Sequence, residues 1–262
     1  MIEKLKSIEN IKNGRYSSVK KQFHGDFRMH SHEYYEIEFI ISGTGTYTVD
    51  GKTYDVKPGM LFFMTPANFH TLDVCDCIMY NIMFSENMCD LKYLSSTVSA
   101  DFPVALQLDE IDLQFFEAVA NELSKEECDA NYAFFLISTI IGKLCRFAKC
   151  DEKRALSPVA MAELYILNNF RNNISLNEVA EYVGFSPAYF SAVFGKETGK
   201  NFKEYTNELK YDYAKKLLEF TTLTGVEVCM ESGFEEYTNF IRRFKQRFGM
   251  SPGQYRKSKS TK

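Results

Sequence analysis

The spacing of hydrophobic residues divides this chain of 262 residues into a strand-like first part and a helical remainder. Up to residue 84, the apolar residues form short runs separated by glycine and proline, and many are β-branched or aromatic, as in strands. Asp50-Gly51 lies between two such runs and is typical of a tight hairpin. The pattern predicts an antiparallel β-barrel or sandwich within residues 1–108, with strands at Ile37–Ile41, Thr46–Val49, Met60–Met64 and Ile78–Phe84.

Residues 109–150 follow a helical period instead. A break at Glu127–Asn131 divides this segment into two predicted helices, since each side of it carries an apolar stripe. The stripes are Phe115, Phe116, Val119 and Leu123, then Phe135, Leu136, Ile140, Ile141, Leu144 and Phe147. Both helices could simply cover the barrel, or the second could pair with its twin in a dimer. A polar stretch at residues 151–157 is the expected linker to a second domain, residues 158–262.

The last third of the chain carries one pattern twice. Each copy has a hydroxyl residue, a glutamate three positions later, a turn glycine and two phenylalanines four positions apart. The copies are Ser175, Glu178, Gly184, Phe190 and Phe194, then Thr224, Glu227, Gly233, Phe240 and Phe244. The hydroxyl and glutamate form a capping box, which begins a helix, and glycine commonly ends one. Each copy therefore predicts a helix-turn-helix whose second helix buries its phenylalanines.

Charge separates the two parts of the chain. From Leu156 onward there are 15 Lys and Arg against 12 Asp and Glu, whereas the preceding residues hold 16 against 23. Arg242, Arg243, Lys245 and Arg247 lie together in the second predicted recognition helix, without an acidic residue among them. A charged run alone is usually a solvated helix face. Within a helix-turn-helix it favours binding to DNA phosphates.

This part of the chain resembles the AraC/XylS family of transcription regulators. The resemblance covers residues 157–257 and is carried by Gly233-Phe234, Asn239-Phe240-x-Arg242-x-Phe244-Lys245 and Phe248-Gly249-Met250-Ser251-Pro252-x-x-Tyr255-Arg256. It implies two helix-turn-helix units joined by a long helix, here Phe202–Phe220. It also implies that both recognition helices enter successive major-groove segments of double-stranded DNA.

The resemblance further implies which side chains face the DNA. They are Tyr189, Ser191 and Lys196 in the first copy, and Thr238, Asn239, Arg242, Arg243 and Lys245 in the second. Arginine can bind guanine, and asparagine adenine, through paired hydrogen bonds. The first copy has Ala192 at the position of Arg242, where many family members carry arginine. We therefore expect the second helix to supply more of the affinity.

Four side chains of the predicted barrel form a candidate ligand or metal site. His30, His32 and Glu36 resemble the first cupin motif, and His70 the second. On one extended segment the first three would project to the same face. Three imidazoles and a carboxylate suit Fe, Mn, Zn or Ni, but they also suit hydrogen bonds to an organic ligand, or are ordinary buried polar groups. Tyr35 and Tyr47 are candidates for the same binding site, where aromatic walls would suit stacking on a sugar or ring.

These expectations combine into one α+β protein: a cupin-like antiparallel β-barrel with following helices, then an all-α domain of two helix-turn-helix units. The expected function is sequence-specific transcription regulation, as an activator that senses a small molecule such as a sugar or related metabolite. The alternative is a metal-dependent cupin enzyme, an isomerase or dioxygenase. The expected partners are double-stranded DNA, RNA polymerase, the effector and a second copy of the chain. No cofactor is expected, with a divalent metal left open.

The remaining composition excludes several other classes. The first residues lack an apolar signal region, and no apolar run reaches the ~18 residues of a membrane span, so we expect a soluble cytoplasmic protein without membrane contact. The seven cysteines include no C-x-x-C pair, which indicates neither a disulfide framework nor a zinc finger. The chain also lacks a Walker loop, a dinucleotide fingerprint and a nucleophile elbow.

Overall fold

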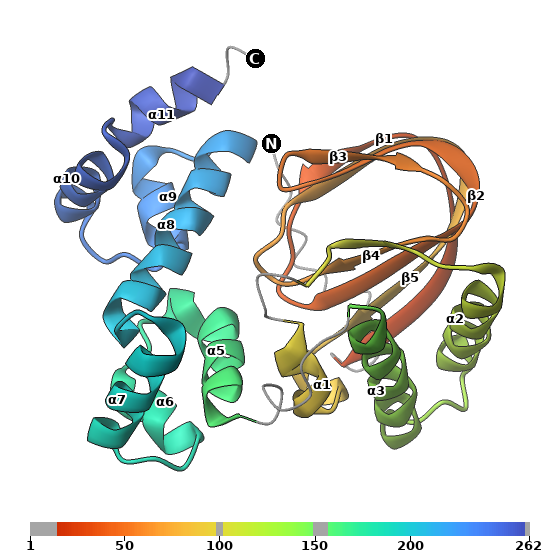
Figure 1. The fold of residues 1–262 in the computed structure, drawn as a ribbon. Helices are drawn as coiled ribbons and strands as arrows, with labels where there is room; N and C mark the ends of the chain where they lie inside the picture. The colour runs from red at the N-terminus through yellow and green to blue at the C-terminus, as the bar shows by residue number, and fades with distance from the viewer. Residues whose placement is uncertain (1–14, 98–101, 149–156, 260–262) are drawn as a thin grey trace. The chain divides into compact units, whose positions relative to one another are not determined.

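A computed structural model describes residues 15–97, 102–148 and 157–259, which belong to two compact units (Figure 1). The first unit contains the strands and the helices up to Phe147, and the second begins at Ser157. The α+β class is as predicted. Most of the predicted linker, residues 151–156, lies outside the described residues.

The first unit is built on a six-stranded antiparallel sheet in the order β1-β5-β2-β4-β6, with β3 paired to β2. The strands are β1 (Tyr16–His30), β2 (Tyr35–Val49), β3 (Lys52–Val56), β4 (Met60–Met64), β5 (His70–Phe84) and β6 (Ala105–Gln107). The sequence did not predict β1 or β6, gave no bounds for β3, and placed the start of β5 too late.

The strands predicted at Ile37–Ile41 and Thr46–Val49 are one continuous strand, β2, so the predicted break between them is wrong. Gly43 and Gly45 lie inside β2 with φ of +109° and +143°. A Cβ at either position would collide with the backbone of β5, so glycine here permits close strand contact while the strand bends. The register with β5 shifts at the same place.

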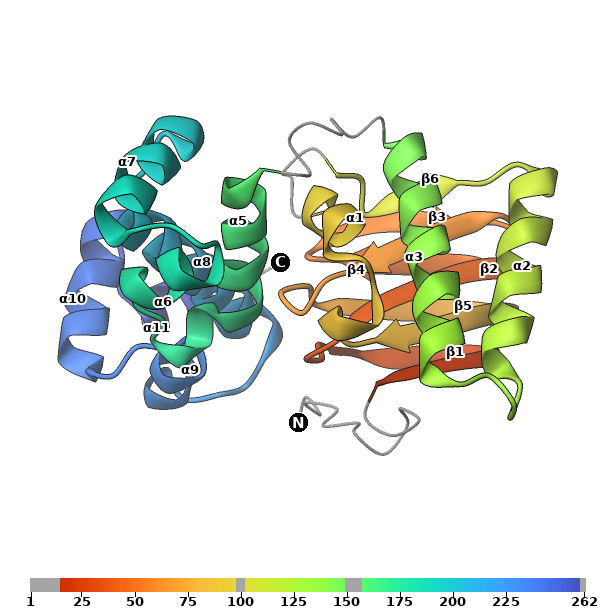
Figure 2. The same ribbon diagram turned by 90° about the horizontal axis from the view of Figure 1, so that it is seen from below.

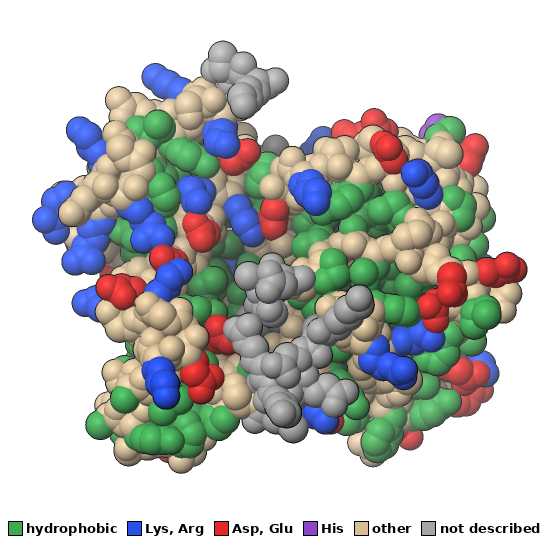
Figure 3. Space-filling model, viewed as in Figure 1, with side chains coloured by type: hydrophobic (Ala, Val, Ile, Leu, Met, Phe, Trp, Pro, Cys, Tyr) green, Lys and Arg blue, Asp and Glu red, His purple; other side chains and the backbone are tan. Residues whose placement is uncertain are grey.

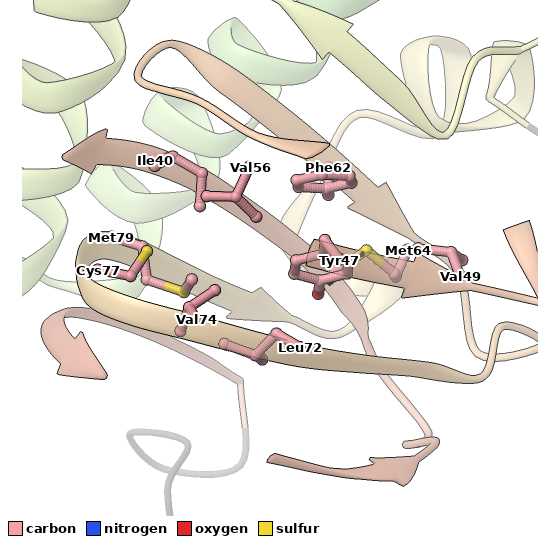
Figure 4. Close-up of a cluster of buried hydrophobic side chains, with 10 residues drawn as sticks. All are labelled: Ile40, Tyr47, Val49, Val56, Phe62, Met64, Leu72, Val74, Cys77 and Met79. Atoms are coloured by element: carbon pink, nitrogen blue, oxygen red, sulfur yellow. Dashed lines mark hydrogen bonds between the residues drawn. The ribbon is translucent and has the colours of Figure 1, made fainter. Parts of the chain in front are cut away.

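One face of the sheet encloses an apolar cluster. Figure 4 shows side chains from β2, β4 and β5 pointing toward one another, with the ring of Tyr47 stacked on Phe62 at 4.0 Å between centroids. Both rings are fully buried. The same face carries the polar side chains of Glu36 and Glu38 farther along β2, because side chains two positions apart share a face.

Helices cover the other face of the sheet. They are α1 (Leu91–Ser96), α2 (Glu110–Ser124) and α3 (Ala130–Phe147), preceded by a short 3-10 turn, η2 (Glu86–Met88). Figure 2 shows α2 and α3 lying across the strands. The Ser18 hydroxyl donates to the Ala120 carbonyl at 2.8 Å, and the rings of Phe39 and Phe116 meet edge to face.

The predicted apolar stripe of the second helix divides between two environments. Ile140, Ile141 and Leu144 are buried within the unit, as expected for a helix that covers the sheet. Phe135 is 67% exposed and Phe147 is 37% exposed. The helix therefore covers the sheet with one face and leaves aromatic rings on another.

The second unit is all-helical. Its elements are α5 (Pro158–Asn169), η3 (Phe170–Asn172), α6 (Leu176–Tyr182), α7 (Pro187–Thr198), α8 (Phe202–Phe220), α9 (Gly225–Glu231), α10 (Tyr237–Phe248) and α11 (Pro252–Lys259). Both predicted capping boxes are present, and α8 has the predicted bounds. Across the described parts of the chain, we find no helix with the length and apolar character that crossing a membrane requires.

Candidate effector pocket and nucleic-acid interface

Three of the four histidine and glutamate residues predicted to form a ligand or metal site meet in one buried hydrogen-bonded group. Glu36 Oε2 lies 2.7 Å from His32 Nε2 and 3.2 Å from His70 Nε2. His30 adjoins this group, with its ring centroid 4.1 Å from that of His70. The residues come from the end of β1, the connection after it and the starts of β2 and β5. The predicted single extended segment is thus wrong, although the side chains still converge.

The amide of Asn81 and the carboxylate of Glu38 extend this network, and neither residue was predicted from the sequence. Asn81 Nδ2 donates to Glu36 Oε1 at 2.6 Å and to Glu38 Oε1 at 2.7 Å. The Tyr47 hydroxyl donates to Glu38, which brings Tyr47 into this network. Glu38 could have been found, because it lies two positions after Glu36 on a predicted strand and so shares its face.

Tyr35 does not join the group. Its ring stacks on Phe63 and Phe84, with centroids 6.0 and 5.6 Å away, and it is buried against these residues on the opposite face from Glu36. The reason is the alternation of side chains along β2, which sends neighbouring residues to opposite faces. Tyr35 is therefore a core residue, and its predicted place in the ligand pocket is wrong.

Burial and charge together set the protonation of the pocket. Burial opposes ionisation of Glu36, but the imidazoles of His32 and His70 outweigh it and hold its pKa well below the usual range. Burial also opposes protonation of His70, yet its hydrogen bond to Glu36 leaves its pKa raised. Burial and the neighbouring His70 lower the pKa of His30 to about 3, whereas burial and Glu36 raise the pKa of Glu38. At neutral pH, Glu36 is anionic and His30 neutral.

The space beside these groups is small. A cavity of about 50 Å³ is lined by the polar residues His30, Glu36, Glu38 and Asn81 and by side chains of β1, including Phe27. Phe27 is also 38% exposed to solvent. Pockets for drug-sized ligands measure ~300–1,000 Å³. A ligand as large as a sugar therefore requires the β1 wall to move outward.

Three of the buried polar residues also fit a divalent metal. Ligand atoms of His32, Glu36 and His70 all lie within 4.8 Å of one another, and two imidazoles with one carboxylate are a common set for iron and related ions. His32 Nδ1 is 2.9 Å from the Tyr34 carbonyl, the kind of bond that orients a metal-ligating histidine. His30 is outside this trio, and its Nδ1 bonds the Arg28 carbonyl.

The two recognition helices of the second unit, α7 and α10, bury their paired phenylalanines and expose the predicted DNA-facing residues. Phe190, Phe194, Phe240 and Phe244 are at most 1% exposed. Tyr189, Ser191 and Lys196 of α7 are exposed, as are Thr238, Arg242, Arg243 and Lys245 of α10, with Asn239 half-buried. In Figure 3, Lys and Arg side chains gather over α10 and α11, whereas apolar side chains are prominent over α7.

Asn239 has a role that the sequence did not indicate. Its Oδ1 accepts from Arg242 Nη2 at 2.9 Å and from Arg243 Nε at 3.1 Å, so one amide oxygen orients both arginines. A paired contact with adenine needs this same oxygen. Asn239 therefore either holds the arginines in place or binds adenine after releasing them.

Comparisons with known proteins match both units. Residues 179–258 match the model of a helix-turn-helix domain, and residues 23–77 match the model of the AraC-like ligand binding domain. This chain belongs to the AraC family of transcriptional regulators. The resemblance inferred from the sequence is confirmed. The alternative of a metal-dependent cupin enzyme is wrong, because the matched models and relatives are transcriptional regulators.

Three similar proteins illustrate the extent of this likeness. The HTH-type transcriptional regulator YfiF of Bacillus subtilis is 24% identical over 89% of this chain and 80% of its own length. YtdP of the same organism is 33% identical over 36% of this chain, which spans only 12% of that longer protein. The crystal structure of ToxT from Vibrio cholerae is 13% identical, covers 92% of this chain and 97% of its own, and has a TM-score of 0.41.

In this AraC-family regulator, Lys210 of α8 joins the two helix-turn-helix units from inside. Its Nζ donates to Asn173 Oδ1 at 2.8 Å, before the first unit, and to the Gly233 carbonyl at 2.6 Å, in the turn of the second. Asn173 Nδ2 in turn donates to Glu235 Oε1 at 2.7 Å. Gly233 must lack a side chain, since a Cβ there would collide with the backbone of Arg171. These bonds fix the turn of the second helix-turn-helix against the segment that leads into α6 of the first.

We predict that Lys210→Met destabilises the second unit by about 1–3 kcal/mol, because the buried Gly233 carbonyl loses its donor. Urea unfolding of the full-length protein measures this change. Lys200→Met is the matched control, since Lys200 loses the same charge but only a partly exposed ion pair with Glu208, worth less than about 1 kcal/mol. Equal effects of the two substitutions would contradict the internal role of Lys210.

We also predict an acid-sensitive contribution from His30. Below pH ~6.5 the His30 side chain of the unfolded chain binds a proton, whereas in the folded protein it stays neutral until about pH 3. The free energy of unfolding therefore decreases as the pH falls from ~6.5 to about 3. His70 acts with the opposite sign, because its raised pKa adds stability that is fully present below its unfolded value and is lost as the pH rises through its folded value. Comparison with His30→Gln isolates the first effect.

Between pH 7 and pH 5, the free energy of unfolding should fall by about 2 kcal/mol more in the natural protein than in His30→Gln. Denaturant unfolding at the two pH values measures the difference. His24→Gln is the control, because the His24 side chain is 70% exposed, and it should behave as the natural protein. Parallel pH dependences of the natural protein and His30→Gln would show that His30 titrates normally in the fold.

Proposed function

We propose that this regulator is an activator whose effector is a small polyhydroxylated molecule, a sugar or related metabolite, bound among His30, His32, Glu36, His70 and Tyr47. The observation that carries the proposal is the buried polar group on an otherwise apolar face of the sheet. Glu36 bonds to His32, His70 and Asn81, and Glu38 bonds to Tyr47 and Asn81. Hydroxyl groups of a ligand can both donate to carboxylates and accept from imidazoles, so they can replace those bonds.

The proposed response begins with the opening of the small cavity. A sugar that replaces the bonds from Glu36 to His32 and His70 separates the start of β2 from the start of β5 and displaces Phe27. Such a ligand favours the open state only by binding it more tightly than the closed one. DNA-bound protein in the appropriate state would then contact RNA polymerase beside a promoter. In this proposal the protein acts in the cytoplasm.

The proposed roles of the domains use the boundaries predicted from the sequence. Residues 1–108 form the sensing domain, 109–150 the dimerisation and connector segment, 151–157 the linker and 158–262 the DNA-binding domain. The dimer contact is the outer face of α3, where Phe135, Thr139 and Arg146 lie exposed along one side of the helix. An exposed phenylalanine in such a stripe favours helix pairing, because a second copy would remove it from water.

A divalent metal is the second candidate for the same pocket, favoured by the convergence of His32, Glu36 and His70. These three side chains would hold the ion, which would offer open positions for ligand oxygens. A buried ring nitrogen of His70, Nδ1, has no hydrogen-bond partner in the described part of the chain, and a bound ligand or water could supply one.

For the effector site, we predict that His70→Gln abolishes the rise in melting temperature that an effector produces in the full-length protein. A panel of sugars, polyols and divalent metal salts supplies the probes, and an effector at about 100 times its Kd should add ~2.7 kcal/mol to the natural protein. His24→Gln replaces an exposed histidine in the same way and should retain the response. Retention by His70→Gln would move the effector site elsewhere, and a response only to metals would favour the metal.

For the dimer, we predict that Phe135→Glu weakens self-association at least tenfold, since burying a phenylalanine side chain is worth ~1.5–3 kcal/mol. Sedimentation equilibrium of the full-length protein gives the dissociation constant. Val226→Glu is the control, because Val226 is an exposed apolar residue of the other unit. A monomeric natural protein, or an unchanged constant in Phe135→Glu, would contradict pairing through this face.

A further inference from the structure

The two recognition helices differ in chemistry at every matching surface position. Residues of α10 lie 50 positions after their counterparts in α7, as Phe240 and Phe244 do after Phe190 and Phe194. Across this offset Ala188 matches Thr238, Tyr189 matches Asn239, Ala192 matches Arg242, Val193 matches Arg243 and Gly195 matches Lys245. The helix α10 thus carries three cations where α7 carries none.

Before its last turn, the exposed surface of α7 is uncharged and consists of small side chains beside one tyrosine. Ala188, Ser191 and Ala192 are all exposed, and Tyr189 is 57% exposed. The opposite side of the helix is fixed, because Phe190 and Phe194 both contact Phe202 of α8 at 6.4 Å between ring centroids. The exposed side is therefore the one available to a partner, and Lys196 in the last turn is its first basic residue.

Small apolar side chains suit one feature of the major groove. The C5-methyl of thymine is the apolar group that B-DNA presents there, and alanine contacts it without hydrogen bonds. Arginine and asparagine, by contrast, select guanine and adenine through paired bonds. We propose that α7 selects thymine through apolar contacts of Ala188 and Ala192 with thymine methyl groups, while α10 selects guanine through its arginines. This proposal rests on the DNA-binding function of the family.

The spacing of the two alanines limits the number of bases involved. Residues four positions apart on a helix have Cβ atoms ~6 Å apart, close to two base steps of ~3.4 Å. One or two thymines are thus within reach of Ala188 and Ala192. Because neither residue is charged, their contribution should resist added salt, whereas that of the α10 cations should weaken.

The test begins with sites that the full-length protein selects from a random duplex library. We expect two segments about one helical turn apart. The segment whose guanine preference disappears in Arg242→Ala belongs to α10, and the other should contain thymine. Replacing each thymine in that other segment by deoxyuridine removes only the methyl group. Each contacted methyl should then cost about fourfold in affinity, from ~0.8 kcal/mol per buried methyl-sized group.

Matched comparisons make the result specific to α7. Deoxyuridine in the α10 segment should leave affinity unchanged, and the penalty in the α7 segment should be the same at about 50 and 200 mM salt. Ala192→Gly should reduce that penalty, with melting temperature verifying that the protein remains folded, while Arg242→Ala should preserve it. A second segment without thymine, the absence of a second segment, or a deoxyuridine penalty that is nil or confined to the α10 segment would each overturn the proposal.

Discussion

The buried carboxylate of Glu36 constrains the whole first unit. An anion inside a sheet is costly unless it is paired and hydrogen-bonded, and Glu36 obtains partners from His32, His70 and Asn81. These partners come from the connection after β1 and from both ends of β5, so one charge ties together the strands that enclose the cavity. Any ligand that enters must satisfy Glu36 as well as its present partners do. That requirement links ligand chemistry to strand arrangement.

The second unit depends on a buried charge of the opposite sign. Lys210 is only 8% exposed, and its bonds to Asn173 and to the Gly233 carbonyl hold the two helix-turn-helix units in one arrangement. Recognition of two groove segments needs a fixed relation between the two helices, since a flexible pair would lose conformational entropy on binding. The exposed surfaces of the two helices nevertheless differ: that of α10 is cationic, whereas that of α7 is mostly uncharged and carries exposed alanines.

Local signals made the second unit predictable from the sequence, and long-range pairing limited the prediction of the first. Capping boxes and turn glycines act within a few residues, so the first helix of each copy was predicted to begin at its observed N-cap. The strand β1 was missed because its polar side chains resemble a loop until β5 pairs with it. The residue types indicated a binding site, but the face of β2 to which each side chain points was not worked out. For this reason Tyr35 was misplaced and Glu38 was overlooked. The hydrogen bonds of Lys210 join residues that are distant in the sequence, so no local pattern predicted them.

Hydroxyl-radical footprinting of the full-length protein, on DNA upstream of its own and neighbouring genes at about 150 mM salt, tests the central claim most directly. The account predicts two protected segments per bound protein, about 10 base pairs apart on one side of the helix. It also predicts that an effector changes the occupancy of these segments while their spacing within one protein stays constant, because Lys210 fixes the two helix-turn-helix motifs relative to each other within the second unit. Absence of protection, or a single protected segment, would contradict it.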